Sequence, residues 1–205
     1  MMYKHLLIPQ RFLVALTVLV VSFALFSSAV RAADNAGAQR FIDDMGREAI
    51  SFLADDNLSQ AQKEAKFRQM LRNKFDIDTI GRFVLGRNWK AATPAQQKEY
   101  LRLFENLIVE VYSARFKDYN GEDFTVASAK DTGKNDSVVS SYIVPASGSK
   151  VKVDWRVRNK NGQFKIIDVI IEGVSMSLTQ RSDFSSVIQR GGGKVEALLV
   201  SLRSK

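Results

Sequence analysis

The chain of 205 residues contains no cysteine, and its one histidine, His5, lies close to the N-terminus. Without cysteine, disulfides and cysteine nucleophiles are excluded. Without histidine in the rest of the chain, Cys/His zinc sites and Ser-His-Asp triads are excluded there as well. Proline is also scarce, with three residues, and neither Pro94 nor Pro145 interrupts a patterned segment. Any chemistry beyond the N-terminal segment must therefore use carboxylates, hydroxyls, lysine or arginine.

The N-terminal segment has the three parts of a secretory signal peptide. Lys4 and Arg11 give it a basic start, residues 12–26 are almost continuously apolar, and residues 30–32 are mostly small. An uncleaved membrane anchor is the alternative, because about 20 apolar residues are enough to cross a bilayer. Serines interrupt the apolar run where a cleavage site would lie, so we expect residues 1–32 to be a signal peptide that is removed.

Cleavage would leave a single domain over residues 33–205 and lower the formal net charge from +8 to +5, because the leader holds three basic residues and no acid. Since an exported protein is separated from nucleic acid, we expect a basic one to have anionic lipid headgroups or an acidic protein as partners. An exported chain without cysteine must be stabilised by a packed core.

Residues 33–121 show helical periodicity. Helix starts are indicated by Ser59 with Gln62, by Asp76, and by Thr93-Pro94 with Gln96. Ile42, Met45 and Ala49 recur at helical spacing before the first of these starts. The helix that Pro94 opens has a wide apolar arc and should end near residues 119–121, and its width predicts that more than one side is covered.

Residues 122–205 begin with a period of two, which indicates strands with one buried face. Strands are expected at 124–131, 137–145, 151–158 and 164–172, forming a four-stranded antiparallel sheet. A three-residue loop, Asn161-Gly162-Gln163, would join the last two strands. This register pairs Trp155 with Val169, Val157 with Ile167 and Val153 with Ile171, and it places Arg156 beside Asp168 and Lys152 beside Glu172.

The C-terminal part predicts two helices, Thr179–Arg190 and Lys194–Leu202, separated by three glycines. Helices segregated from one antiparallel sheet predict an α+β fold, with the helices packed against the Trp155 face. The glycines followed by Lys194 do not form a phosphate-binding loop, because Val195 follows the lysine where Ser or Thr is required.

Two patterns allow a functional and a structural interpretation. The basic row from Lys150 to Lys165 is either a solvated sheet face or a docking surface for an acidic partner or membrane. Asp168 and Glu172 would lie roughly 13 Å apart along a strand, too far for a glycosidase pair. An isomerase-like site that uses a buried Asp with Tyr112 or Tyr142 remains an alternative.

Two blocks of the chain resemble the MlaC-type phospholipid-shuttle proteins, also called the toluene-tolerance auxiliary family. The first block is the stretch Phe75–Lys90, followed by Thr93-Pro94, Gln97 and Tyr100. The second comprises Asp154–Val157, Lys165–Val169, Glu172–Met176 and Gln180–Phe184. Lys90 and Tyr100 depart from the Arg and Phe that we expect in this family.

The resemblance implies a periplasmic carrier, not an enzyme, with its sheet curved around an apolar pocket that holds the acyl chains of a phospholipid. Such a carrier would pass lipid between an outer-membrane lipoprotein complex and an inner-membrane ABC transporter that carries a substrate-binding ring, and so maintain outer-membrane lipid asymmetry. It would need no cofactor, no metal and no catalytic residue.

We expect the pocket wall to come from the sheet and from the helix that Pro94 opens, with two rim residues after the last strand. The candidate wall residues are Phe104, Ile108, Val111, Tyr112, Val153, Trp155, Ile167, Val169, Ile171, Val174 and Met176. Two alternatives stay open, because a pattern does not distinguish a hollow core from a solid one: a small-molecule enzyme on a cone-shaped α+β fold, and a structural envelope protein with a filled core.

Overall fold

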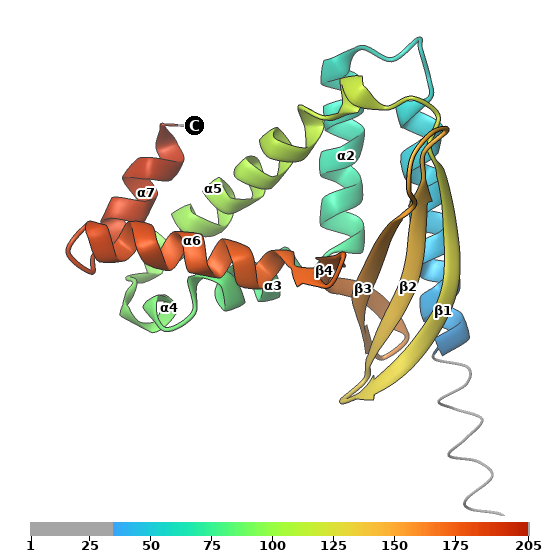
Figure 1. Ribbon diagram of the computed structural model, residues 1–205. Coiled ribbons are helices and arrows are strands. Elements are labelled where there is room, and N and C mark those ends of the chain that lie inside the picture. The colour runs from blue at the N-terminus through green and yellow to red at the C-terminus, as the bar shows by residue number, and fades with distance from the viewer. Residues whose placement is uncertain (1–34, 205) are drawn as a thin grey trace, which may run out of the picture.

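The computed structural model describes residues 35–204, in which helices pack beside a curved antiparallel sheet (Figure 1). The expected signal peptide, residues 1–32, lies outside the described residues. Within residues 35–204 no helix combines the length and the apolar character needed to span a bilayer.

The helices fall into an N-terminal and a C-terminal group around the sheet. Residues 35–53 are helical, and α2 (Gln60–Lys74), α3 (Ile77–Leu85), α4 (Asn88–Ala91), α5 (Pro94–Ser113), the 3-10 turn η1 (Phe116–Asp118), α6 (Met176–Arg190) and α7 (Val195–Arg203) follow. The strands are β1 (Asp123–Gly133), β2 (Asp136–Val144), β3 (Val151–Lys160), β4 (Gln163–Ile171) and β5 (Val174–Ser175).

The helix starts read from the sequence are confirmed by their caps. Ser59 and Thr93 each form a capping box, with Gln62 and Gln96 respectively, and Asp76 accepts a hydrogen bond from the Thr79 amide. Each box satisfies two amides that a helix start would leave without a partner. Two helix boundaries were wrong: α5 ends at Ser113, before the expected residues 119–121, and α6 begins at Met176, three residues before Thr179.

Within residues 35–204 the sheet has five strands in the order β1-β2-β3-β4-β5, so the expectation of four strands was wrong. The additional strand, β5, has two residues and pairs with the end of β4 through Ile171 and Val174. A two-residue turn joins them, in which Glu172 and Gly173 have φ angles of 48° and 82°. A strand this short has no alternation of its own, so no periodicity could reveal it.

The β3–β4 hairpin has a two-residue loop, not the expected three-residue loop. Lys160 pairs with Gln163, and Asn161 and Gly162 adopt φ angles of 55° and 84°, as in the type I′ turn that Asn-Gly favours. A bulge in β4 at Ile167 then shifts the pairing by one residue.

The bulge has a direct effect on the predicted register. Beyond it the predicted pairs are present: Arg156 lies opposite Asp168, Trp155 opposite Val169 and Val153 opposite Ile171. Before it, Val157 pairs with Ile166, so the predicted Val157–Ile167 pair is wrong. The Asn161-Gly162 turn favours one register, and burial of the inner face favours a register shifted by one residue. The extra residue in β4, Ile167, allows both.

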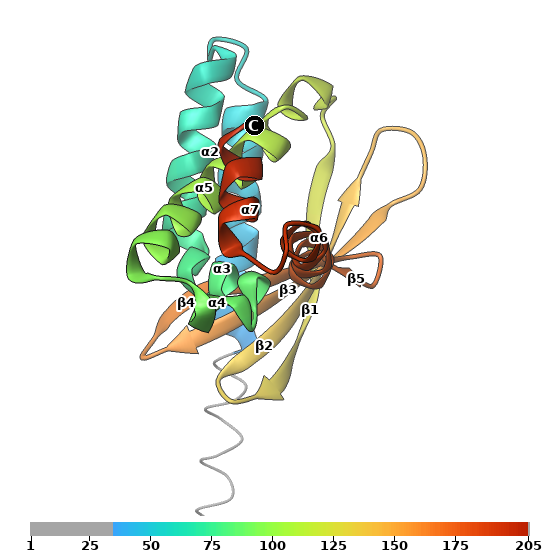
Figure 2. The same cartoon turned by 90° about the vertical axis from the view of Figure 1, so that its left-hand side faces the viewer.

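Most buried apolar side chains among residues 35–204 belong to one of two clusters. The helical cluster joins α3, α5, α6 and α7 and contains Tyr100, Phe104 and Phe184. The sheet-side cluster joins helical residues 35–53 and α2 to the inner face of the sheet and contains Ile42 and Val157. Figure 2 shows the molecule from the side, with α6 seen end-on near β3 and β5. Phe75, which follows α2, packs against both clusters.

Part of the basic row on the outer sheet face is neutralised by one acid, Asp136. Its side chain is 1% exposed and accepts hydrogen bonds from the Arg156 Nη2 (2.9 Å) and from the Arg158 Nε and Nη2 (2.7 and 2.9 Å). Arg156 lies opposite Asp168 in the β3–β4 pairing, but it forms its ion pair with Asp136 on β2.

Replacing Asp136 should destabilise the protein in a pH-dependent way. Burial alone would raise the pKa of the Asp136 carboxyl, but the two arginines lower it below its ordinary value. A carboxyl with a lower pKa in the folded state contributes stability at neutral pH, and this contribution is lost as the pH falls through the folded pKa. We expect Asp136→Asn to cost about 2 kcal/mol at pH 7 and less at pH 3, measured by urea unfolding at both values. An equal cost at the two pH values would contradict this assignment.

Candidate functional site

A cavity of about 610 Å³ lies between the sheet and the helices. Its volume falls within the roughly 300–1,000 Å³ that is usual for ligand sites. The walls come from helical residues 35–53, α2, α3, α5, η1, the inner face of β1–β4 and the start of α6. Most lining side chains are aliphatic or aromatic, so the cavity offers little to a polar ligand except at its rim.

Most of the predicted wall residues line this cavity. Those on α5 are Phe104, Ile108 and Tyr112, those on the sheet are Val153, Trp155, Val169 and Ile171, and Met176 is the first residue of α6. The residues on α5 lie four apart, so they share one face of the helix, and the sheet residues alternate along β3 and β4. The structure therefore brings these eight side chains together around one space.

Three predicted wall residues do not line the cavity. Ile167 is the bulge residue of β4 and has no partner on β3, so the inward alternation passes to Ile166. Val174 is 53% exposed beyond the Glu172-Gly173 turn. Val111 lies one residue before Tyr112 near the end of α5, where its side chain is 48% exposed.

The N-terminal helices supply a large part of the wall that sequence reasoning missed. The cavity is also lined by Met45, Ala49, Leu53, Phe67, Met70, Leu71, Phe75, Ile77, Ile80, Phe116 and Phe124. The helical spacing of Met45 and Ala49 was visible in the sequence, but a core residue and a cavity residue give the same pattern. Gly46 also lines the cavity, and a side chain there would collide with the Phe124 ring, since its Cβ would lie 2.2 Å from the nearest ring atom.

Trp155 is the largest wall side chain on the sheet, and its polar atom is satisfied within the protein. Its indole Nε1 donates to the Ser141 Oγ (2.8 Å), and the Ser141 hydroxyl donates to the Val153 carbonyl (3.0 Å). The Trp155 ring meets Phe124 edge-on at 6.3 Å. A tryptophan N–H that already has an acceptor leaves only apolar surface facing the cavity.

The polar lining residues gather near one end of the sheet. Asp123, Ile143, Val153 and Ile171 lie near this end, because β1 and β3 begin there while β2 and β4 end there. The segment after α5 leads into the same end and adds the charged residues Arg115, Asp118 and Glu122 to the lining. Tyr112 at this rim is 39% exposed, and desolvation raises the pKa of its hydroxyl although Arg115 partly opposes the shift.

The isomerase-like alternative requires a carboxyl in the cavity that is free to take a proton. Asp168 lines the cavity, but its Oδ2 accepts from the Ser175 Oγ (2.6 Å) and its Oδ1 from the Val169 and Ser177 amides (2.9 and 3.2 Å). It therefore caps the start of α6. Asp136 is the one buried acid among residues 35–204; it does not line the cavity, and its pKa is lowered. Tyr142, the second tyrosine of this alternative, does not line the cavity either.

Comparison with known proteins identifies the family. A family model described as "MlaC protein" matches residues 43–204. The chain belongs to the MlaC family. The curated relatives include the "Intermembrane phospholipid transport system binding protein MlaC" of Haemophilus influenzae, 23% identical over 72% of each chain. They also include the "Toluene tolerance protein ttg2D" of Pseudomonas putida, 27% identical over 59% of this chain and 57% of that protein.

A solved structure shares the MlaC fold described above. It is the phospholipid-binding protein from Ralstonia solanacearum in complex with a phospholipid, which superposes with a TM-score of 0.69 at 23% identity. The match covers 83% of this chain and 94% of that chain. The likeness shows that the arrangement of helices and sheet is common to both proteins.

Proposed function

We propose that this protein is a periplasmic carrier that holds the acyl chains of a phospholipid in the cavity between its sheet and its helices. One observation carries the proposal: a space of about 610 Å³ with predominantly apolar walls and its charged residues at the rim. A phospholipid has the matching division, with apolar tails and a polar head.

The energetics favour an apolar cavity for this task. Each methylene transferred from water gains about 0.8 kcal/mol, so two chains of about fifteen methylenes would cost on the order of 25 kcal/mol if they were left in water. A cavity nearly as apolar as the bilayer removes this cost. Since cavity and bilayer are then closely matched, the carrier's own affinity does not set the direction of transport.

The partners must therefore set the direction. We propose that lipid passes between an outer-membrane lipoprotein complex and an inner-membrane ABC transporter with a substrate-binding ring, and that this exchange maintains outer-membrane lipid asymmetry. The relative from Haemophilus influenzae carries the name of an intermembrane phospholipid transport system, which supports this setting. Residues 1–32 would export the chain, and residues 33–205 would act as a single lipid-binding domain that performs no catalysis.

The headgroup should remain at the rim, where water can reach it. Arg115 offers a cation for the phosphate, and Asp118 and Glu122 lie on the same rim. A solvated head needs few specific contacts, which is consistent with a sequence that shows no headgroup-binding motif. The eight wall residues on α5, β3, β4 and α6 are then the proposed tail-binding residues.

The purified protein should contain a lipid before any is added. We expect organic extraction of protein purified under native conditions, followed by mass spectrometry, to recover diacyl phospholipid at close to one molecule per protein. The enzyme and filled-core alternatives both predict an empty extract. An extract without phospholipid, from protein that also fails to take up phospholipid from liposomes, would overturn the proposal.

A further inference from the structure

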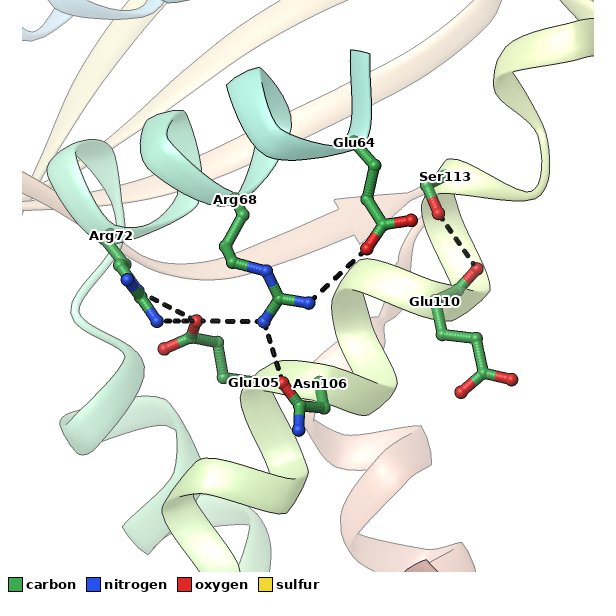
Figure 3. Close-up of polar contacts among 7 residues, drawn as sticks. All are labelled: Glu64, Arg68, Arg72, Glu105, Asn106, Glu110 and Ser113. Atoms are coloured by element: carbon green, nitrogen blue, oxygen red, sulfur yellow. Dashed lines mark hydrogen bonds and ion pairs between the residues drawn. The ribbon is translucent and has the colours of Figure 1, made fainter. Parts of the chain in front are cut away.

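Helices α2 and α5 form one wall of the cavity together, and polar contacts join them on the side that faces away from it. Phe67, Met70 and Leu71 of α2 and Phe104 and Ile108 of α5 face the cavity. Across the outer side of the same helix pair run the ion pairs and hydrogen bonds drawn in Figure 3. The contact between α2 and α5 therefore has an apolar inner side and a charged outer side.

Glu105 is the centre of these outer contacts. Its Oε1 lies 3.3 Å from the Arg68 Nη1 and 2.8 Å from the Arg72 Nη2, so one carboxylate of α5 holds two arginines of α2 (Figure 3). The Arg68 Nη1 also donates to the Asn106 Oδ1 at 2.7 Å, and the Arg68 Nη2 lies 3.5 Å from Glu64. We call Arg68, Arg72, Glu105 and Asn106 the α2–α5 clamp.

The clamp joins two helices that contribute to different hydrophobic clusters. Met70 of α2 belongs to the sheet-side cluster, whereas Phe104 of α5 belongs to the helical cluster. Since both helices line the cavity, separation of α2 from α5 would widen it. Charged groups near solvent are held together far less strongly than a packed core, so this contact should open before either cluster does.

We infer that the α2–α5 clamp sets the rate at which the cavity opens for lipid to enter and leave. Glu105 and Arg68 act as positioning residues, since they hold two walls together and do not line the cavity. The inference rests on the proposed function, because it gives one contact a role in lipid exchange. It predicts fast exchange wherever the clamp is weakened, with the amount of bound lipid unchanged.

The variant Glu105→Gln should transfer lipid faster than the wild type. Loss of the carboxylate leaves Arg68 and Arg72 four residues apart on one helix face with no shared anion, so they repel each other. We expect about a fivefold faster transfer, in line with the modest strength of partly exposed ion pairs. Transfer is measured with protein loaded with a pyrene-labelled phosphatidylethanolamine and mixed with phosphatidylcholine liposomes.

The chain provides a matched control on the same helix. Glu99 of α5 accepts from the Arg203 Nε and Nη2 of α7 at 2.7 and 2.9 Å. This pair joins two helices of the helical cluster, and neither residue lines the cavity. Glu99→Gln therefore removes a comparable ion pair from the same helix without releasing a cavity wall. We expect it to leave the transfer rate at the wild-type value.

Ionic strength gives a test that needs no substitution. The outer side of α2 borders a shallow hollow of about 290 Å³ that includes Glu64, Arg68 and Arg72, so salt can reach the clamp. Wild type and Glu99→Gln should transfer lipid faster in 0.5 M than in 0.05 M sodium chloride, because salt screens exposed charges. Glu105→Gln should respond much less, since its clamp is already broken.

A cross-link tests the inference in the opposite direction. The natural chain has no cysteine, so Arg72→Cys/Glu105→Cys introduces the only two thiols. This double variant should transfer lipid quickly when reduced and more slowly than the wild type once a short bis-maleimide joins α2 to α5.

The outcomes separate the two proposals. Equal transfer rates for wild type, Glu105→Gln and Glu99→Gln would overturn the role of the clamp and leave the carrier proposal standing. So would a cross-linked double variant that transfers lipid as fast as the same variant before cross-linking. A wild-type protein that holds no phospholipid and takes none from liposomes would overturn the carrier proposal itself.

Discussion

Purified Ile108→Asp should contain almost no phospholipid, less than about a tenth of the wild-type amount, while it still unfolds cooperatively in urea. Ile108 lines the cavity from α5 and is only partly buried, at the border of the helical cluster. An unpaired carboxylate on an apolar surface costs several kcal/mol once a lipid tail excludes water from it. In the empty cavity water can hydrate the same carboxylate. The substitution therefore penalises the lipid-bound state far more than the folded state.

Two further variants complete this experiment. Val169→Asp places the same charge on the sheet wall and should also empty the cavity. Val111→Asp is the matched control, because Val111 lies on the same helix, is 48% exposed and does not line the cavity. It should retain the wild-type amount of lipid. If Ile108→Asp keeps its lipid, or if Val111→Asp loses as much, the cavity walls are wrongly assigned.

The sequence was most informative where a local rule determines the structure. Ser59 and Thr93 open helices because a hydroxyl and a glutamine three residues later satisfy two amides, and no distant contact is needed. The inner face of β3 was predictable for a similar reason. Trp155 and Val157 alternate with charged residues, and a shift of the strand by one residue would turn those charges toward the core.

The sequence was misleading where two local preferences compete. The buried face requires Trp155 opposite Val169, and Asn161-Gly162 favours a two-residue turn, but without a bulge these two requirements exclude each other. We predicted the pairing correctly and derived an incorrect loop from it. Ile167 was assigned to the wall for this reason, since an uninterrupted strand would direct its side chain inward.

The missed part of the wall has a different origin. Met45, Ala49, Phe67 and Phe116 line the cavity, but their helical spacing would be the same if they packed against other side chains. Whether an apolar helix face packs against other side chains or borders an empty space depends on the distance between the helices and the sheet. That distance is a property of the whole fold, and no single segment encodes it. The sequence therefore predicted an apolar interior, and only the structure located its hollow part.

The solid part of the interior should carry most of the stability, which Phe104→Ala tests. Phe104 is 1% exposed, stacks on Tyr100 at 5.7 Å and meets Phe184 edge-on at 6.2 Å. Truncation of a phenylalanine in such a cluster removes contacts on nearly every side of its ring, although one edge also reaches the cavity. We expect the free energy of unfolding to fall by about 3–5 kcal/mol, measured by urea denaturation of delipidated protein. Delipidation is necessary because bound lipid would stabilise the folded state by mass action.

Ile108→Ala is the matched comparison, one helical turn further along the same wall. The Ile108 side chain borders the empty space, so its truncation removes fewer contacts and should cost less than about 2 kcal/mol. A similar loss for the two variants would mean that the cavity is filled by side chains in solution, which would argue against a carrier. A large loss in the free energy of unfolding for Phe104→Ala alone would show that the helical cluster is solid and stabilises the fold. It would also show that the next turn of α5 borders an empty space, which a carrier needs for lipid tails.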